Sequence, residues 1–345
     1  MIEIFIAILV SFLVVLLFTP KAIEILREKG FTGTDVHKPE KPEIPKGAGT
    51  VYLFAIVFAL LVILGSKTFQ SYEIEMVGTL AALVSILMAG MIGFMDDNLD
   101  FSNKTKVILP LIATIPMIAL SVGTPTMSIP FIGTINFGIA YALIIVPLMM
   151  TFIIDATNMY AGMNGLEAGL ASINASGLVI YVLLTPILKG TPISAEQLEA
   201  AIIAGALLGA SLAFLVFNRY PAKVLMGDVG TLPIGATIGA ALITGNMDRL
   251  AILMYAPFAL NFLLYIIYRV YVKRKGIEWV KFAKPREDGT LEVIGPFTMY
   301  WILPYFSKNM TEKRNVIILI LFQALLVYGA LFLMILGYPL GLGII

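Results

Sequence analysis

The chain has no cysteine and a single histidine, His37, among its 345 residues. Without cysteine there can be no disulfide, no thiolate nucleophile and no zinc–cysteine site. One histidine also excludes a histidine-rich metal centre. Charge is scarce as well, because charged residues make up 13% of the chain, against about 25% in soluble domains. The net charge of +1 gives no reason to expect a nucleic-acid partner.

Apolar sequence takes the place of charge. Hydrophobic residues make up 59% of the chain, and runs long enough to cross a bilayer recur from end to end. The first run lacks the small-residue cleavage signature of a signal peptide, so we expect it to stay as a helix. The sequence therefore predicts an all-α, multi-pass integral membrane protein with ten spans, at residues 2–19, 50–66, 75–95, 107–123, 138–156, 166–188, 197–217, 231–246, 249–272 and 315–337.

Lysine and arginine orient these spans. Five loops hold 19 of the 23 basic residues, and loops of this kind face the cytoplasm. We predict one membrane domain over residues 1–345, with both termini outside and the functional site on the cytoplasmic face. If the source is prokaryotic, the membrane is the cell membrane. The five basic-side loops are residues 20–49, 96–106, 157–165, 218–230 and 273–314. On the opposite face, residues 123–138 predict a small hairpin.

An acidic cluster marks the end of the third span. Residues 76–95 carry no charge, and then Asp96, Asp97 and Asp100 follow within five positions. Carboxylates at a helix C-terminus oppose the helix dipole and repel one another. A bound divalent cation would relieve both conflicts, because Mg²⁺ prefers carboxylate and water oxygens completed by substrate phosphates. The alternative is a pair of solvated carboxylates. Lys106 is either a phosphate contact or a marker of the membrane boundary.

Two further loops on the same face carry polar groups between glycines. Asn158 and Asn164 supply neutral donors and acceptors, and Gly162, Gly165 and Gly169 permit close approach of the backbone to a ligand. Glu167 lies at the inner end of an apolar span, where ionisable groups are usually functional. Capping of helices by Asn and Gly is the alternative.

In the loop 218–230, Asp228 opens a predicted span, where it would act as an N-cap, a metal ligand or both. A helix N-terminus also attracts phosphate.

The first and last basic-side loops are less specific. The first contains Asp35 and Lys38 in a Pro-rich stretch that also fits a solvated linker, and we expect His37 to be exposed there and assign it no catalytic role. The last, 273–314, is too long for a mere connector. Its Arg286 could clamp a phosphate through its planar fork, or anchor the loop at the membrane. Together the loops predict a site for a metal ion and a diphosphate.

At this point the residues resemble a known family. Residues 91–97, 158–169 and 218–230 are similar to the polyprenyl-phosphate N-acetylhexosamine-1-phosphate transferases. The string from Ala161 to Gly169 is most similar to the eukaryotic and archaeal branch, which makes dolichyl-diphospho-N-acetylglucosamine. The bacterial branches usually carry Asp-Gly where Asn164-Gly165 stands. The resemblance covers almost the whole chain.

The resemblance implies a role for each candidate residue. Asp96 and Asp97 would form the catalytic acidic motif, with Asp97 assisting the acceptor phosphate, and Lys106 would lie at the phosphates. Asp228 would hold Mg²⁺, for which Mn²⁺ could substitute, with Asn158 at the metal and the diphosphate. The substrate-binding residues would be Asn158, Asn164 against uracil, Glu167 as a support of its loop, Arg286 on the diphosphate, Lys38 and Asp35. The loop 273–314 would cover the sugar nucleotide.

The implied reaction joins UDP-N-acetylglucosamine to dolichyl or polyprenyl phosphate and releases UMP, as a first membrane step of glycan assembly. The partners are then these two substrates and membrane lipid, with a homodimer as one assembly the chain could form. Three alternatives stay open: another UDP-N-acetylhexosamine, an intramembrane aspartyl protease and a secondary transporter. The protease would need Gly-x-Gly-Asp, whereas the chain has Leu225-Met226-Gly227-Asp228. The transporter would place charged groups near mid-span.

Overall fold

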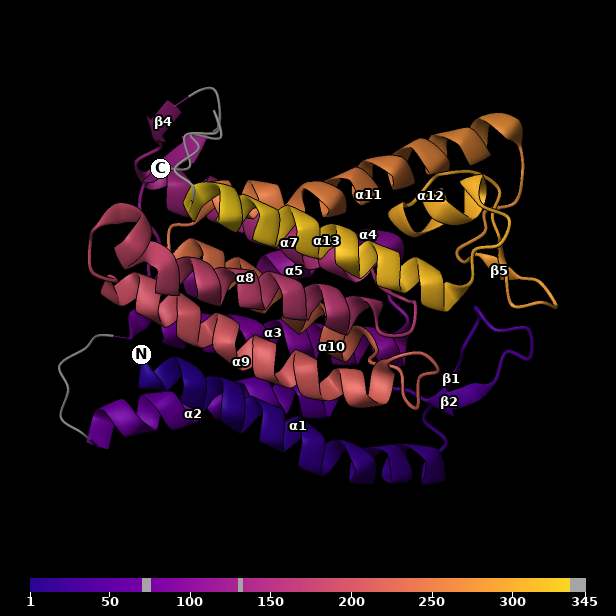
Figure 1. Cartoon of the computed structure of the whole chain (residues 1–345), viewed down its shortest axis with the longest axis horizontal. Coiled ribbons are helices and arrows are strands. Elements are labelled where there is room, and N and C mark those ends of the chain that lie inside the picture. The colour runs from indigo at the N-terminus through magenta and orange to yellow at the C-terminus, as the bar shows by residue number, and fades with distance from the viewer. Residues whose placement is uncertain (70–75, 130–132, 336–345) are drawn as a thin grey trace.

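A computed structural model describes residues 1–69, 76–129 and 133–335 of the chain. Its helices run side by side along the long axis of the molecule (Figure 1). In the described residues, eight helices are long and apolar enough to cross a membrane. They are α1 (Ile2–Glu28), α2 (Gly49–Phe69), α3 (Val77–Leu99), α7 (Val146–Met159) with the π-helical turn η1 (Tyr141–Ile145), α8 (Leu166–Lys189), α9 (Ala195–Asn218), α11 (Asp248–Lys275) and α13 (Glu312–Ile335).

Two of the ten predicted spans differ from this description. Span eight corresponds to α10 (Asp228–Thr244), an apolar helix of 17 residues. Span four, predicted as one helix over 107–123, is wrong as a continuous helix. Instead, α4 (Asn103–Ile108), α5 (Pro110–Ala113) and α6 (Ile115–Ala119) follow one another. Pro110 and Pro116 stand at the breaks, and proline lacks the amide hydrogen that an unbroken helix needs. The number of ten spans stays a prediction.

Short elements gather at the two ends of the bundle (Figure 1). At one end lie the antiparallel pairs β1 (Thr32–Thr34) with β2 (Glu43–Pro45) and β5 (Lys284–Pro285) with β6 (Leu291–Glu292), together with α12 (Met299–Phe306). At the other end β3 (Thr126–Ile129) pairs with β4 (Gly133–Asn136), which confirms the predicted hairpin. Residues 130–132 within it lie outside the described residues.

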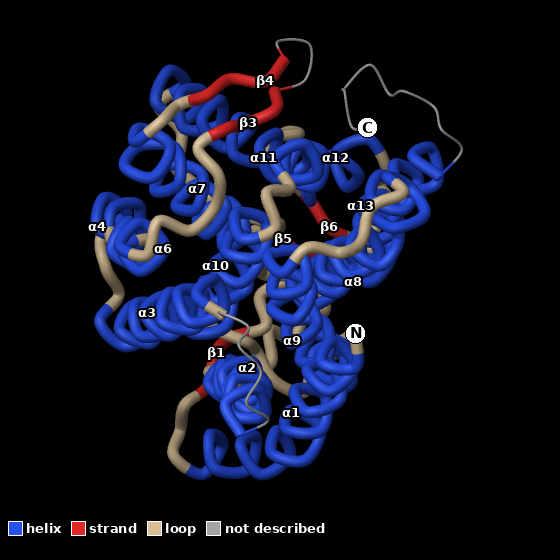
Figure 2. Tube along the Cα trace, turned by 90° about the vertical axis from the view of Figure 1, so that its left-hand side faces the viewer, coloured by secondary structure: helices blue, strands red, loops and turns tan. Residues whose placement is uncertain are grey.

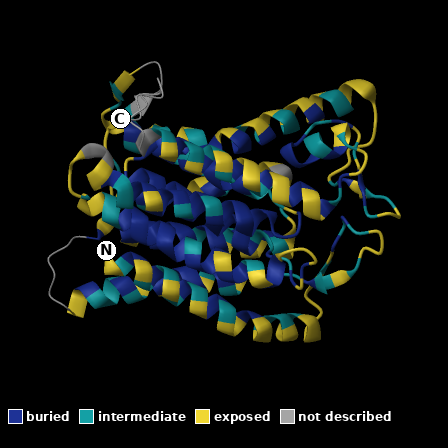
Figure 3. Ribbon diagram, viewed as in Figure 1, coloured by how far each residue is buried: buried dark blue, intermediate teal, exposed yellow. Residues whose placement is uncertain are grey.

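The core of the bundle surrounds α10. Figure 2, turned to the side, places α10 among α3, α7, α8 and α9, and Val229 to Thr244 are all buried. Figure 3 shows the same division, with buried residues on the central helices and exposed ones on the outer helices. Many of those exposed side chains are large and apolar, such as Phe5, Leu17 and Phe94. An outer surface of this composition suits lipid rather than water.

The described part of the chain begins and ends at the same end of the bundle. The first turn of α1 and the last turn of α13 lie there, opposite to β1, β2 and α12 (Figure 1). The C-terminal residues 336–345, on which the prediction of an outside C-terminus depends, lie outside the described residues. The side of the membrane that each end faces stays a prediction.

Candidate active site

The acidic cluster is assembled by close packing of α3 against α10. A Cβ added at Gly93 of α3 would overlap the backbone carbonyl of Asp228 at the start of α10. A Cβ added at Gly227 would lie 2.6 Å from Oδ2 of Asp97. Because glycine lacks that atom, the two helix ends approach closely enough for the carboxyl group of Asp228 to interact with those of Asp96 and Asp97.

Asp97 is a capping group for α10. Its Oδ2 accepts a 3.0 Å hydrogen bond from the backbone amide of Val229, in the first turn of that helix. Its Oδ1 lies 2.9 Å from Nζ of Lys46. A carboxylate at the C-terminus of α3 opposes the dipole of that helix, but the same carboxylate lies at the positive N-terminus of α10. The apparent electrostatic conflict in the sequence is therefore offset by a neighbouring helix. Asp228 itself is the first helical residue, and the N-cap is Gly227.

Lys106 forms ion pairs with the other two aspartates of the acidic cluster. Its Nζ lies 3.0 Å from Oδ1 of the buried Asp96 and 3.6 Å from the fully exposed Asp100. Partial burial acts to lower the pKa of Lys106, but the hydrogen bond to Asp96 and the nearby carboxylates outweigh it and raise that pKa. Since α4 is short, Lys106 falls in its last turn, where the dipole favours a cation.

Asn158 faces the first turn of α10. Its Oδ1 accepts a 2.9 Å hydrogen bond from the hydroxyl of Thr231, three residues after Asp228. Asn158 and Asp228 also line one cavity of about 300 Å³. The two residues predicted to hold a metal ion are therefore neighbours, although they come from different helices.

The described residues contain no group of three or more His, Cys, Asp or Glu side chains arranged to hold a metal ion. A metal at this site would accordingly have few protein ligands.

Asn164 and Lys38 form a buried polar network. Oδ1 of Asn164 accepts from Nζ of Lys38 at 2.6 Å and from the backbone amide of Ala222 at 2.9 Å. The same Nζ pairs with Asp35 and lies 3.2 Å from Oε2 of Glu312. Oε1 of Glu312 accepts from the backbone amide of Asn164 at 2.8 Å. The side-chain oxygen of Asn164 thus accepts two hydrogen bonds, and its amide nitrogen can donate one to a ligand.

The cavity brings together half of the predicted site residues. It is lined from the first loop, from the loop between α7 and α8, from residues 218–231 and from the last loop. Of the predicted set it includes Asp35, Asn158, Asn164, Glu167 and Asp228. Two cations that the sequence analysis did not select, Lys46 and Lys281, line it as well. Lys46 and Asp97 also line a smaller cavity of about 210 Å³, with the apolar side chains of Leu26, Phe31 and Phe94.

Arg286 is not among the residues that line the cavity. Its guanidinium contacts Thr290, the carbonyl of Lys308 and Glu292, all in or beside its own hairpin. Lys281, five residues earlier, is the basic residue that the last loop contributes to the cavity. A lysine in a basic-side loop is too common a feature for the sequence to have distinguished it. The role of Arg286 stays a prediction.

His37 was expected to be exposed, and this is wrong. Its exposed fraction is 3%, because its ring packs edge-on against Phe282 of the last loop, with centroids 5.7 Å apart. Burial lowers the pKa of His37 to about 4; the Asp35 carboxylate opposes this change and Lys38 adds to it. His37 is therefore a neutral contact between the first and last loops, both of which line the cavity. Glu312, like Lys46 and Lys281, was not selected from the sequence, although an acidic residue just before an apolar span is a usable signal.

These features define a helical membrane protein with an acidic site at one end of its bundle. Residues 79–246 match the sequence model of glycosyl transferase family 4. A protein of Saccharolobus solfataricus named "Putative UDP-N-acetylglucosamine--dolichyl-phosphate N-acetylglucosaminephosphotransferase" is 34% identical over 82% of each chain.

The enzyme of Dictyostelium discoideum with the same name, without the qualifier, is 26% identical over 89% of this chain and 82% of its own. A phospho-N-acetylmuramoyl-pentapeptide-transferase of Halalkalibacterium halodurans is 29% identical over 78% of this chain and 83% of its own. The chain belongs to glycosyl transferase family 4, and family membership favours neither the protease nor the transporter alternative.

Proposed function

We propose that the protein transfers N-acetylglucosamine-1-phosphate from UDP-N-acetylglucosamine to dolichyl or another polyprenyl phosphate, and releases UMP. The names of the relatives in Saccharolobus and Dictyostelium support these two substrates. The observation that carries the proposal is the joining of Asp96, Asp97 and Asp228, with two lysines, beside a cavity lined by the Asn158–Glu167 segment.

The chemistry is a displacement at phosphorus. An oxygen of the acceptor phosphate attacks the β-phosphorus of the sugar nucleotide, the bond from that phosphorus to the bridging oxygen breaks, and UMP leaves. The substrates carry several negative charges, so positioning and charge stabilisation dominate the catalysis. We assign this stabilisation to Lys106 and Lys281. The contact of Arg286 with the diphosphate, which the family resemblance implies, stays a proposal. Asp97 orients the acceptor phosphate.

The nucleotide would bind through the buried network. Asn164 lines the cavity, and its amide nitrogen is a donor suited to a carbonyl of uracil. Lys38, which pairs with Asp35, and Glu312 hold Asn164 in place. In this assignment Lys38 and Asp35 act on the substrate through Asn164. Glu167 lines the same cavity and supports the loop.

The residues fit a single Mg²⁺ ion, which we propose is held by Asp228 and Asn158. Asp96, Asp97 and Asp228 are neighbouring carboxyl groups that repel one another when ionised, an arrangement that a divalent cation would stabilise. Mg²⁺ uses one or two carboxylates and takes its remaining ligands from water and substrate phosphates, so the absence of a three-residue cluster among the described residues is no obstacle. When bound, the ion would withdraw charge from the diphosphate. Mn²⁺ is expected to substitute.

We propose that the site faces the cytoplasm, because the loops that form it carry most of the basic residues. There a water-soluble sugar nucleotide can meet an acceptor lipid at the membrane surface. The experiment that tests the function measures release of UMP from a panel of UDP-sugars by the purified protein with Mg²⁺ and dolichyl phosphate. We expect UDP-N-acetylglucosamine to be the preferred donor. Preference for another UDP-N-acetylhexosamine would keep the chemistry and change the substrate.

A further inference from the structure

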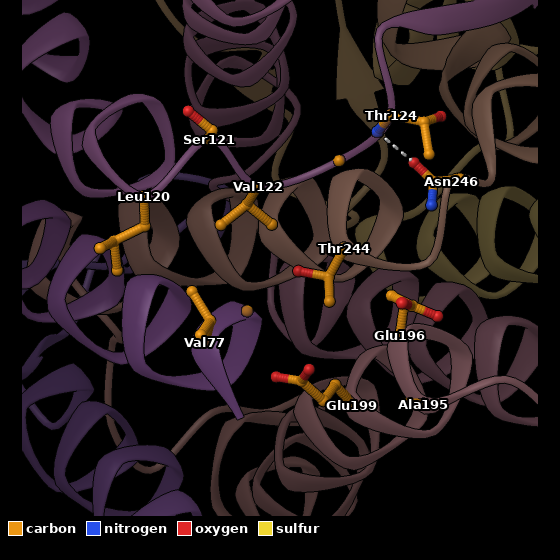
Figure 4. Close-up of a pocket in the computed structure, with 12 residues that line it drawn as sticks. Val77, Leu120, Ser121, Val122, Thr124, Ala195, Glu196, Glu199, Thr244 and Asn246 are labelled. Carbon is orange, nitrogen blue, oxygen red and sulfur yellow. Dashed lines mark hydrogen bonds between the residues drawn. The ribbon is translucent and has the colours of Figure 1, made fainter. Parts of the chain in front are cut away.

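A second large cavity lies away from the acidic site. It has a volume of about 680 Å³ and forms where α3 and α9 begin and α6 and α10 end (Figure 4). None of the residues predicted from the sequence lines it. It lies at the opposite end of the helices from Asp97 and Asp228, so the proposed transfer reaction does not account for it.

The polar groups of this cavity favour a cation. Glu196 and Glu199 stand three positions apart on α9, which places them on one face of the helix. The other polar side chains of the lining are Ser121, Thr124, Thr244 and Asn246, which are neutral. The described lining contains no lysine, arginine or histidine. Two carboxylates without a basic partner at their own site attract a positive ligand.

Glu199 caps the N-terminus of α3. Its exposed fraction is 6%, and its Oε2 accepts hydrogen bonds from the backbone amide of Thr79 at 2.6 Å and the hydroxyl of Thr79 at 2.9 Å. Since the N-cap residue Met76 offers no side-chain bond, Glu199 serves as the cap of α3. Capping explains one carboxylate at this position. The exposed Glu196 lies in the first turn of α9, where the helix dipole favours a carboxylate. Neither role accounts for the space in front of the two carboxylates.

Thr244 supplies an independent indication of a ligand. Its exposed fraction is 2%, and its hydroxyl has no hydrogen-bond partner. The helical threonines Thr157 and Thr237 donate to the carbonyl four residues earlier, at 2.7 Å in each case. Thr244 ends α10 without such a bond and lies between Val122 and Glu199 at the cavity (Figure 4). A buried hydroxyl without a partner is costly, and a ligand with a donor would satisfy it.

We propose that this cavity binds a primary alkylammonium group. The ammonium would lie between the Glu199 carboxylate and the Thr244 hydroxyl, with Glu196 as the outer charge, because its three hydrogens need three acceptors. Its alkyl chain would contact Val77, Leu120 and Val122. The cavity is too large for a bare metal ion, and the described residues offer no three-residue metal cluster. The same chemistry could come from a soluble diamine or from the headgroup of an aminolipid.

The test is calorimetric titration of the purified full-length protein in detergent with 1,5-diaminopentane, and with 1,5-pentanediol as the uncharged control. We expect saturable binding of the diamine and none of the diol. Thr244→Val keeps the shape of the side chain and leaves the cap of α3 intact, and we expect it to weaken binding about tenfold. Glu199→Gln should weaken it at least as much. Glu40→Gln, the same charge change on an exposed loop at the other end, should have no effect.

The same titration in lipid nanodiscs distinguishes a soluble amine from an aminolipid as the natural ligand. If the natural ligand is an aminolipid, phosphatidylethanolamine discs will suppress diamine binding and phosphatidylcholine discs will not, because a quaternary ammonium has no hydrogen to donate. If the ligand is soluble, neither lipid will compete. Equal binding of diamine and diol, or unchanged binding by both Thr244→Val and Glu199→Gln, overturns the proposal.

Discussion

At the residue scale, both oxygens of the Asp97 carboxylate have partners. One oxygen caps α10 and the other pairs with Lys46, so this carboxylate is held rigidly beside the substrate cavities. The carboxyl group of Asp228 lies beside those of Asp96 and Asp97, and like charges at this distance repel one another. Asp97 is therefore suited to orient a substrate, and Asp228 to accept a cation.

Asp228→Asn should therefore abolish most of the activity without unfolding the protein. Loss of one preorganised electrostatic contact typically lowers kcat by about two to three orders of magnitude, and the cap from Asp97 to Val229 remains in place. The measurement is the rate of UMP release over a range of Mg²⁺ concentrations. Asp100→Asn is the matched control, because Asp100 is fully exposed, and it should retain at least half of the rate. Full Mg²⁺-dependent activity in Asp228→Asn would remove the metal assignment.

Lys38→Met should damage the nucleotide site more than the catalytic cluster. It would leave Asp35 and Glu312 buried without their cation, which typically costs about 3–5 kcal/mol. We expect a lower unfolding temperature and a higher KM for the sugar nucleotide. Lys41→Met, at an exposed position in the same loop, should change neither. A normal KM in Lys38→Met would show that the network does not hold Asn164.

His37 predicts a loss of stability in mild acid. Its pKa is lowered to about 4 in the folded protein by burial and is about 6.5 when unfolded. The unfolded chain therefore binds a proton first as the pH falls, and stability decreases between pH 6.5 and 4. The full effect is on the order of 3 kcal/mol. His37→Gln should show a flatter dependence of unfolding temperature on pH over this window. An identical pH dependence in the two proteins would contradict the assignment.

At the scale of the elements, the long helices followed from the sequence because apolar runs of twenty residues have few alternatives. Span four was the exception, where Pro110 and Pro116 divide the segment into three short helices. The sequence indicated which types of residue form the site, but it did not indicate which of these residues contact one another. Lys38 and Asn164 are 126 positions apart, and Asn164 and Glu312 are 148 apart. Local pattern contains no information on such contacts, which explains why Lys46 and Lys281 were missed. Glu312 could have been selected from its position just before an apolar span.

The contact of α3 with α10 should be sensitive to a single methyl group. Gly93→Ala places a Cβ on the carbonyl of Asp228, so the helices must separate, at about 1–3 kcal/mol or more. We expect lower stability and strongly reduced activity together. Gly65→Ala, at a helical glycine of α2 with nothing within 4 Å of the added atom, should be neutral or stabilising by up to about 1 kcal/mol. Stability and activity are measured by thermal unfolding and UMP release. Equal behaviour of the two variants would argue against the close approach.

At the scale of the whole molecule, the two ends of the bundle differ in kind. One end carries the basic loops and the acidic site, and the other carries the β3–β4 hairpin and the large cavity. The absence of cysteine makes their sidedness easy to test. In intact cells, a membrane-impermeant maleimide should label Asn136→Cys in β4. It should label Glu40→Cys only after permeabilisation. The reverse pattern would place the proposed active site outside the cytoplasm.

The central claim is that the acidic site transfers a sugar phosphate and not the sugar alone. The most direct measurement is mass spectrometry of the nucleotide and the lipid after incubation of the purified protein with UDP-N-acetylglucosamine, dolichyl phosphate and Mg²⁺. We predict UMP, together with a lipid heavier by one N-acetylglucosamine phosphate. Release of UDP with a lipid heavier by the sugar alone, or no lipid product from any UDP-sugar, would contradict the account.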